Sequence, residues 1–302
     1  MITAWAFVNP AFPAAAKASR PGNPVTIGIV ADVQYDREAP VKNKRHYTLG
    51  VKQMTEAVDV FRAVPELSFV ANLGDITDHN YTHYPDIKAV TDRLDVPVYN
   101  VYGNHDFYPA KTAAEFRELA VLKGMRKPYY SVVKGGVRFI FLNTSDVAVH
   151  SAPKDSEERM LAARWYDDLK ALEAPNAKQY NGGIGLQQLV WLEDELCKAD
   201  AKGQWAIVLC HMPMQPFGAR ETLWNSMEVV HMLEKHDCLK AVFCGHNHRG
   251  SYFERCGVHY VNFLGMVEGE NNRFAVATVD KASGIIRIKG YGDEQSRELI
   301  CR

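Results

Sequence analysis

Apolar and polar positions alternate along the chain in blocks that predict strands followed by helices. Residues 25–31 and 67–73 are nearly continuous apolar runs, the pattern of strands covered on both faces. Between residues 44 and 64, Leu49, Met54, Val58 and Phe61 recur at helical spacing, and this segment ends before Pro65. The same reasoning predicts further strands at residues 96–102, 129–133, 137–143, 205–210, 239–244, 258–264, 274–280 and 285–289, and helices from residue 85 and at 112–123, 157–172, 186–202 and 226–236.

These elements predict an α/β fold with two packed, mixed β-sheets flanked by helices. Strand–helix units occur in both halves of the chain, and Gly135-Gly136 marks a hairpin turn between two strands. Because no repeat or low-complexity linker interrupts residues 25–292, we expect one domain there, with residues 293–302 as a C-terminal tail. Residues 1–24 are expected to be an N-terminal tail or the remnant of an export signal, since Ala16-Lys17-Ala18 resembles a cleavage site. The protein would then be cytoplasmic, or exported to the periplasm if residues 1–18 end a signal peptide.

Composition narrows the classes of partner. The 302 residues are 47% hydrophobic and carry a net charge of −1, so neither a nucleic-acid polymer nor a membrane surface is indicated and a small-molecule substrate is expected. No apolar run approaches the roughly 18–20 residues that a membrane span needs. The six cysteines form no CxxC pair, which argues against a zinc ribbon or a disulfide-built fold, although a disulfide or two stays open.

Five short polar motifs follow predicted strands. They are Asp32-Val33-Gln34, Gly74-Asp75, Gly103-Asn104-His105-Asp106, His211 and Gly245-His246-Asn247-His248. Each motif alone is a weak signal, because an isolated histidine is more often structural than a ligand. Five of them at strand ends, where open α/β sheets bind ligands, favour a metal centre.

The residue types indicate which metals such a centre would hold. Carboxylate and amide oxygens combined with imidazole nitrogens, without sulfur, fit Mn²⁺, Fe²⁺ or Zn²⁺ and do not fit an iron–sulfur cluster. The candidate metal ligands are Asp32, Gln34, Asp75, Asn104, His211, His246 and His248.

A shared carboxylate suggests the chemistry. Asp75 can hold two ions roughly 3.5–4 Å apart, and a hydroxide bridging them would be the nucleophile at phosphorus. His105, next to Asn104, is the candidate catalytic residue that protonates the leaving oxygen or holds the phosphoryl oxygens, oriented by a carboxylate such as Asp75 or Asp106.

These motifs resemble those of the calcineurin-like metallophosphoesterase superfamily, which run D-x-H, G-D, G-N-H-D/E, H and G-H-x-H. Gln34 departs from the pattern, because the superfamily has histidine there. Glutamine at this position resembles the manganese-dependent ADP-ribose/CDP-alcohol diphosphatases, and similarity to that family continues over about residues 25–292. The resemblance implies an αββα sandwich, the same seven ligands, His105 as the catalytic histidine, and hydrolysis of the phosphoanhydride in ADP-ribose or CDP-alcohols.

Other residues are weaker candidates. Arg45 can meet a substrate phosphate, although a solvated helix end is an equal alternative. Asn181 and Tyr252 can line a nucleoside pocket, with core packing as the alternative for the ring. Asp78 is expected to support the Gly-Asp turn or to hydrogen-bond behind the ligands.

Two other functions stay open at this point. A phosphodiesterase or phosphomonoesterase acting on another substrate would need the same metal centre. A non-catalytic metal-binding scaffold is the alternative of another class, and it would have no need of a proton donor at His105.

Overall fold

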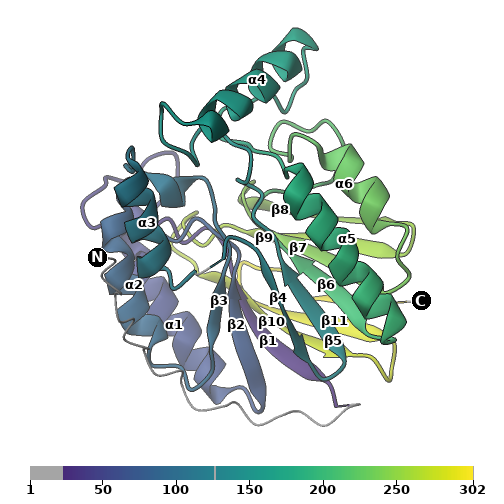
Figure 1. Ribbon diagram of the computed structural model, residues 1–302. Coiled ribbons are helices and arrows are strands. Elements are labelled where there is room, and N and C mark those ends of the chain that lie inside the picture. The colour runs from purple at the N-terminus through teal and green to yellow at the C-terminus, as the bar shows by residue number, and fades with distance from the viewer. Residues whose placement is uncertain (1–22, 126, 302) are drawn as a thin grey trace, which may run out of the picture.

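The computed structural model of the chain describes residues 23–125 and 127–301, in which two six-stranded β-sheets pack together with helices on their outer faces (Figure 1). This arrangement confirms the predicted fold class. The expectation of an N-terminal tail or export signal concerns residues 1–24, and all but the last two of these lie outside the described residues.

The first sheet has the strand order β12-β11-β10-β1-β2-β3. Strands β1, β2 and β3 are parallel, whereas β10 pairs with β1 in the antiparallel sense. The carboxyl ends of the three parallel strands therefore meet at one edge. The strands are β1 (Val25–Val30), β2 (Leu67–Asn72), β3 (Val98–Asn100), β10 (Arg273–Asp280), β11 (Ile285–Gly292) and β12 (Arg297–Ile300).

The second sheet has the order β4-β5-β6-β7-β9-β8. Its four central strands, β5, β6, β7 and β9, are parallel, and β4 and β8 are antiparallel edge strands. The strands are β4 (Tyr130–Lys134), β5 (Val137–Phe141), β6 (Trp205–Leu209), β7 (Leu239–Cys244), β8 (Arg249–Arg255) and β9 (Val258–Leu264).

The main core lies between the two sheets. Phe69 of the first sheet meets Phe139 of the second edge to face, with ring centroids 4.9 Å apart, and Ile27 and Phe243 belong to the same buried cluster. This contact fixes the two sheets against each other, so the turns at their edges have a defined separation.

Helices cover the outer faces of the sheets. The helices α1 (Gly50–Ala63) and α2 (Tyr84–Thr91) pack on the first sheet, with α3 (Ala113–Leu122) beside them, and α5 (Leu186–Ala201) and α6 (Ser226–Leu233) pack on the second (Figure 1). The helix α4 (Glu157–Ala171) projects away from the sandwich at the top of the view. No helix among residues 23–125 and 127–301 is both long and apolar enough to span a bilayer.

The structure corrects two predictions about strands. Residues 293–302, expected to be a tail, contribute β12, whose Leu299 is buried while Ile300 is exposed. Strand β8 was also missed, because its residues are mostly exposed and polar and give no apolar run. Both are edge strands, which need only one buried face or none to pair with a neighbour.

The first predicted helix begins later than its sequence suggests. Residues 47–49 form a 3-10 turn and α1 starts at Gly50, while Arg45 makes isolated bridges to Lys42 and Glu268. The chain before α1 therefore lies against the loop after β9. All six cysteines are free thiols, so the possible disulfides are absent from the structure.

Candidate metal centre

The backbone at the polar motifs has positive φ angles, which residues other than glycine rarely adopt. Five of the ten described non-glycine residues with positive φ belong to these motifs: Asp32 (51°), Gln34 (42°), Asp75 (52°), His246 (75°) and His248 (61°). Such angles cost free energy and persist only where surrounding contacts hold them. Their concentration at five predicted site residues marks a functional region.

Asp106 braces the turn that carries Asp75. Its carboxylate accepts the backbone N–H groups of Asp75 (3.0 Å), Ile76 (2.8 Å) and Gly103 (2.9 Å), and it pairs with the buried ammonium of Lys123 at 2.6 Å. Burial lowers the pKa of Lys123, while the charge of Asp106 opposes that shift. Asp106 thus joins the β2 and β3 turns and does not orient His105, contrary to one of the options that the sequence left open.

Gly103 has a steric reason to be glycine. A Cβ atom there would lie 2.1 Å from Asp75 Oδ1 and 2.3 Å from the Asp75 backbone nitrogen. The two turns consequently approach more closely than any other residue would permit.

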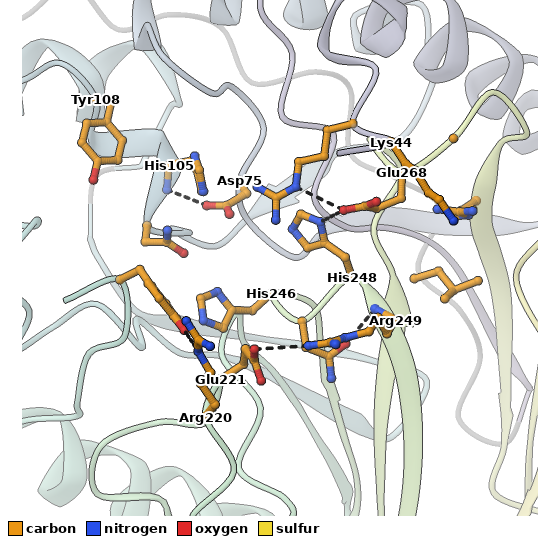
Figure 2. A pocket seen from close by; sticks show the side chains of 17 residues that line it. Lys44, Asp75, His105, Tyr108, Arg220, Glu221, His246, His248, Arg249 and Glu268 are labelled. Atoms are coloured by element: carbon orange, nitrogen blue, oxygen red, sulfur yellow. Dashed lines mark hydrogen bonds and ion pairs between the residues drawn. The ribbon is translucent and has the colours of Figure 1, made fainter. Parts of the chain in front are cut away.

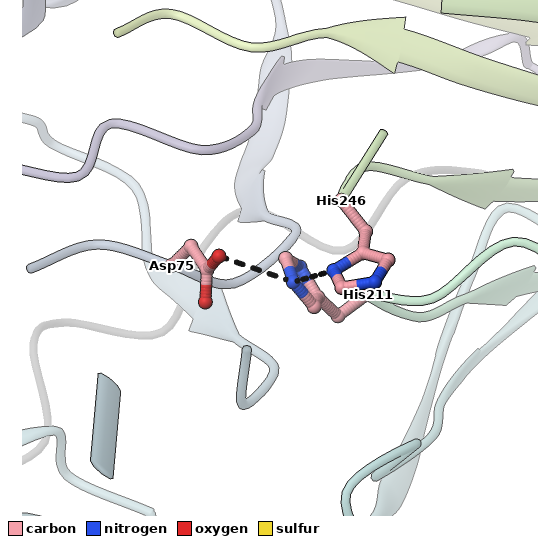
Figure 3. A group of neighbouring side chains, drawn as sticks. All are labelled: Asp75, His211 and His246. Atoms are coloured by element: carbon pink, nitrogen blue, oxygen red, sulfur yellow. Dashed lines mark hydrogen bonds and ion pairs between the residues drawn. The ribbon is translucent and has the colours of Figure 1, made fainter. Parts of the chain in front are cut away.

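One group of possible metal donors joins both sheets. Asp75 Oδ2 lies 3.3 Å from His211 Nε2, which lies 3.1 Å from His246 Nδ1 (Figure 3). Asn104 Oδ1 is 3.2 Å from the same His211 nitrogen. All four side chains are buried, and one donor atom each of Asp75, His211 and His246 lies within 4.8 Å of the others, close enough to surround one ion.

A second group shares Asp75 with the first. Asp32, Asp75 and His248 place one donor atom each within 4.8 Å of one another, and His248 Nε2 is 3.3 Å from Asp32 Oδ1. Gln34 donates to Asp75 Oδ2 at 3.1 Å, and its buried Oε1 has no hydrogen-bond partner among the described residues. An orphaned carbonyl oxygen beside two carboxylates and an imidazole fits a cation ligand.

Hydrogen bonds behind two of the histidines fix which nitrogen faces the site. The Nδ1–H of His211 donates to the carbonyl oxygen of Leu73 at 2.8 Å, and the Nδ1–H of His248 donates to Glu268 Oε1 at 2.9 Å. Because neither acceptor can donate, Nε2 of each ring is left to face the carboxylates. Such outer hydrogen bonds are typical of metal-binding histidines.

His246 is fixed in the same way by Asn181. The amide of Asn181 donates to the carbonyls of Asn176 (2.9 Å) and Arg220 (2.8 Å), so its Oδ1 is the atom that accepts from His246 Nε2 at 2.9 Å. With these three bonds made, the side-chain polar groups of buried Asn181 all have partners. The structure places Asn181 behind His246 and not among the residues that line the cavity, so its contact with a substrate stays a prediction.

The charges of the centre show what a metal would have to displace. Burial by itself would lower the pKa of His211, but the charge of Asp75 outweighs it and raises this pKa to about 9. Asp32 likewise raises the pKa of His248 to about 9 against the effect of burial. Burial and the neighbouring His211 hold the pKa of His246 well below its usual value. The raised pKa values of His211 and His248 mean that a divalent ion would have to compete with protons at these two rings.

His105 pairs with a carboxylate that the sequence did not assign to it. Its Nδ1 contacts Asp78 Oδ1, and its backbone N–H donates to Asp75 Oδ1 at 2.8 Å. Burial would lower the pKa of His105, but the charge of Asp75 and the bond to Asp78 raise it. The orienting carboxylate is thus Asp78 rather than Asp75 or Asp106, because the turn after β2 directs the Asp78 side chain toward the ring.

A cavity of about 900 Å³ opens over these groups (Figure 2). Its walls carry five cationic side chains but only three carboxylates, a balance that suits an anionic ligand. The cationic residues are Lys44, Arg45, Arg220, Arg249 and Arg273.

The cavity includes one weaker candidate and excludes another. Arg45 lines it and pairs with Glu268 at 3.1 Å, so it lies where a phosphate can be reached. Tyr252 lines a neighbouring hollow, and its hydroxyl bonds to His259 Nδ1 at 2.9 Å. The structure thus does not bring Tyr252 to the metal centre, because β8 carries it away from the strand ends.

Glu268 is a site residue that sequence reasoning missed. It contacts both His248 and Arg45, yet it stands alone in a loop after β9 with no motif around it. Its role follows only from the pairing of residues 42–45 with that loop.

Cys210 and Cys244 lie next to ligand motifs but belong to the core on the outer face of the second sheet. Their thiols contact the carbonyls of Met212 and Val261. The metal centre accordingly contains no sulfur donor among the described residues.

Two packed mixed sheets with buried oxygen and nitrogen donors at their strand ends define a metallophosphoesterase. The chain belongs to the calcineurin-like phosphoesterase family, whose model matches residues 25–250. This match confirms the resemblance identified from the motifs.

Known relatives agree with this assignment. The chain is 27% identical over 260 residues to the manganese-dependent ADP-ribose/CDP-alcohol diphosphatase of Oryza sativa subsp. japonica, covering 78% of this chain and 81% of the relative. It is 27% identical over 308 residues to the Homo sapiens protein of the same name, covering 88% and 90%. The crystal structure of a dimetal phosphatase from Danio rerio has the same fold, with a TM-score of 0.81 at 23% identity, covering 94% of this chain and 100% of that one.

Proposed function

We propose that this protein hydrolyses the phosphoanhydride of nucleoside diphosphate-linked compounds such as ADP-ribose and CDP-alcohols, using two divalent ions, with Mn²⁺ preferred. The proposal of two ions rests on the two donor groups that share Asp75. The substrate class and the metal follow from the names of the relatives from Oryza sativa and Homo sapiens.

Each donor group would hold one ion. His211, His246 and Asn104 would bind one of them, Asp32, Gln34 and His248 the other, and Asp75 would contribute to both. The bound ions would lower the pKa of a water molecule and neutralise charge on the phosphates. The orphaned Gln34 oxygen and the inward-facing imidazole nitrogens support this assignment.

His105 is the proposed general acid, which donates a proton to the leaving group. When the phosphoanhydride breaks, the departing phosphate oxygen gains negative charge, which a protonated imidazole can neutralise by donating its proton. The bond to Asp78 keeps the ring directed at the cavity and favours the protonated form. A scaffold without catalysis would have no use for this pair.

The cavity is suited to a substrate with two phosphate groups. Lys44 lies on its wall near Glu268, and Arg220 and Arg249 lie across from it (Figure 2). Arg45 also lines the cavity and pairs with Glu268. Guanidinium groups bind phosphate oxygens in pairs, so opposite walls can hold the two halves of a diphosphate.

A substrate panel tests the proposal. The purified chain with Mn²⁺ is expected to convert ADP-ribose to AMP and ribose 5-phosphate, and CDP-choline to CMP and phosphocholine, faster than it hydrolyses cyclic nucleotides or p-nitrophenyl phosphate. A preference for the monoester over both diphosphates would refute the substrate class. Absence of turnover on every compound with Mn²⁺ bound would favour the scaffold.

A further inference from the structure

A second cluster of metal-binding side chains lies far from the cavity. Glu193 and Cys197 stand one turn apart on one face of α5, and His236 follows α6 just before β7 begins. One donor atom of each lies within 4.8 Å of the others. His211 and His246 follow β6 and β7, whereas this cluster precedes those strands, so it lies at the opposite edge of the sheet.

The imidazole of His236 is held by a carboxylate behind it. Its Nδ1–H donates to Asp200 Oδ2 at 2.6 Å, and Asp200 Oδ1 accepts the backbone N–H of Cys238 at 3.0 Å. Asp200 is thereby fixed, and the ring is directed with Nε2 away from it. This carboxylate–histidine arrangement repeats the one between Glu268 and His248 in the metal centre.

The other nitrogen of His236 has no hydrogen-bond partner among the described residues, although the side chain is only 9% exposed. It lies 3.3 Å from Glu193 Oε2. If His236 Nε2 carried no proton, its lone pair would face the lone pairs of the Glu193 carboxylate, and the two atoms would repel each other. A cation, either on the nitrogen or between the two atoms, removes this repulsion. A proton or a metal ion can fill that need.

The thiol of Cys197 favours the metal. Zinc binds thiolate, imidazole and carboxylate at about 2.0–2.3 Å. The three donor atoms already lie within 4.8 Å of one another, and Glu193 and Cys197 have side chains with solvent-exposed surface. Cys238 is not a fourth donor, since its buried Sγ contacts the carbonyl of Leu196.

We propose that Glu193, Cys197 and His236 Nε2 form a separate zinc site, with water as the fourth ligand, oriented by Asp200. The ion would tie the last turns of α5 to the start of β7. It would stabilise the fold by binding the native state and take no part in hydrolysis. The proposal is independent of the function proposed for the cavity.

A thiolate–metal absorption band distinguishes the two sites, because none of the described residues that line the cavity has a sulfur donor. The full-length chain is stripped with a chelator, titrated with Co²⁺ and followed by its near-ultraviolet thiolate-to-cobalt charge-transfer band. The band is expected in the wild type and in Cys256→Ser, an exposed cysteine outside the cluster, and absent in Cys197→Ser. Wild-type protein should also bind one more Zn²⁺ per chain than Cys197→Ser.

The role of Asp200 in orienting His236 can be tested separately through the zinc affinity of the site. Asp200→Asn should weaken Zn²⁺ binding at this site by about 10–100-fold while the band returns at saturating Co²⁺. No band in the wild type, or an equal band in Cys197→Ser, would overturn the proposal. In that case a proton, not a metal, occupies the contact between His236 and Glu193.

Discussion

The two sheets contribute different chemistry to the metal centre. The turns after β1, β2 and β3 supply carboxylates and amides, whereas the turns after β6 and β7 supply only imidazoles. The proposed oxygen donors are Asp32, Gln34, Asp75 and Asn104, and the proposed nitrogen donors are His211, His246 and His248.

This difference shows why neither sheet can form the centre alone. Carboxylates crowded at one edge repel one another unless cations face them, and buried imidazoles are poor cation sites without anions nearby. His211 joins the halves twice, through Leu73 and through Asp75. Packing of the two sheets therefore determines the site as much as the ligands do.

Removing the shared carboxylate should have the largest effect. Asp75→Asn deprives both donor groups of their common anion, so hydrolysis of ADP-ribose should fall below detection while circular dichroism shows the fold retained. Asp95→Asn, a change on an exposed loop before β3, is the matched control and should leave turnover unchanged. Wild-type rates in Asp75→Asn would show that the two halves do not share a ligand.

Loss of His105 should reduce turnover without removing metal. His105→Asn is expected to lower kcat for ADP-ribose by about 10²–10⁴-fold, the usual contribution of a general acid. The loss should be much smaller for a p-nitrophenyl ester, whose leaving group needs no proton. Equal losses on both substrates would argue that His105 only binds the phosphate.

Replacing a residue that hydrogen-bonds one of the histidine ligands should have a smaller effect on activity. Glu268→Gln weakens the bond that orients His248, so Mn²⁺ affinity should fall by about 10–100-fold and activity should recover at high Mn²⁺. Glu221→Gln is the control, because Glu221 lines the same cavity but pairs with Arg249. If both variants lost the same affinity, the effect would come from the charge of the cavity rather than from His248.

Asn181 should show the smallest effect. Asn181→Ala removes a neutral acceptor from His246, so we expect a loss of Mn²⁺ affinity of about tenfold. At saturating Mn²⁺ the KM for ADP-ribose should stay unchanged. A raised KM with normal metal affinity would support the sequence-based role of Asn181 in substrate binding.

Sequence patterns predicted most of the sandwich because its central strands are apolar on both faces. They missed β8 and β12, since an edge strand needs no such pattern. The helix before Gly50 was overextended because residues 44–46 are polar and give no stop signal, while their pairing with the loop at Glu268 is a long-range contact.

At the site, the sequence predicted that the ligand motifs lie together, but it did not predict which residues hydrogen-bond the histidines. Motifs at the ends of parallel strands converge by topology, so their proximity could be expected. The bond between Asp78 and His105, and those of Glu268 and Asn181 to their histidines, depend on turn geometry and on residues distant in sequence. No spacing rule carries that information.

The central claim is that Asp75 unites two donor groups into one dimetal centre. Counting bound Mn²⁺ by elemental analysis after chelation, reloading and dialysis tests it most directly, because the hard Mn²⁺ ion should avoid the thiol cluster on α5. The account predicts two Mn²⁺ per chain in the wild type and fewer than one in Asp75→Asn. One Mn²⁺ per wild-type chain, or two retained in Asp75→Asn, would contradict it.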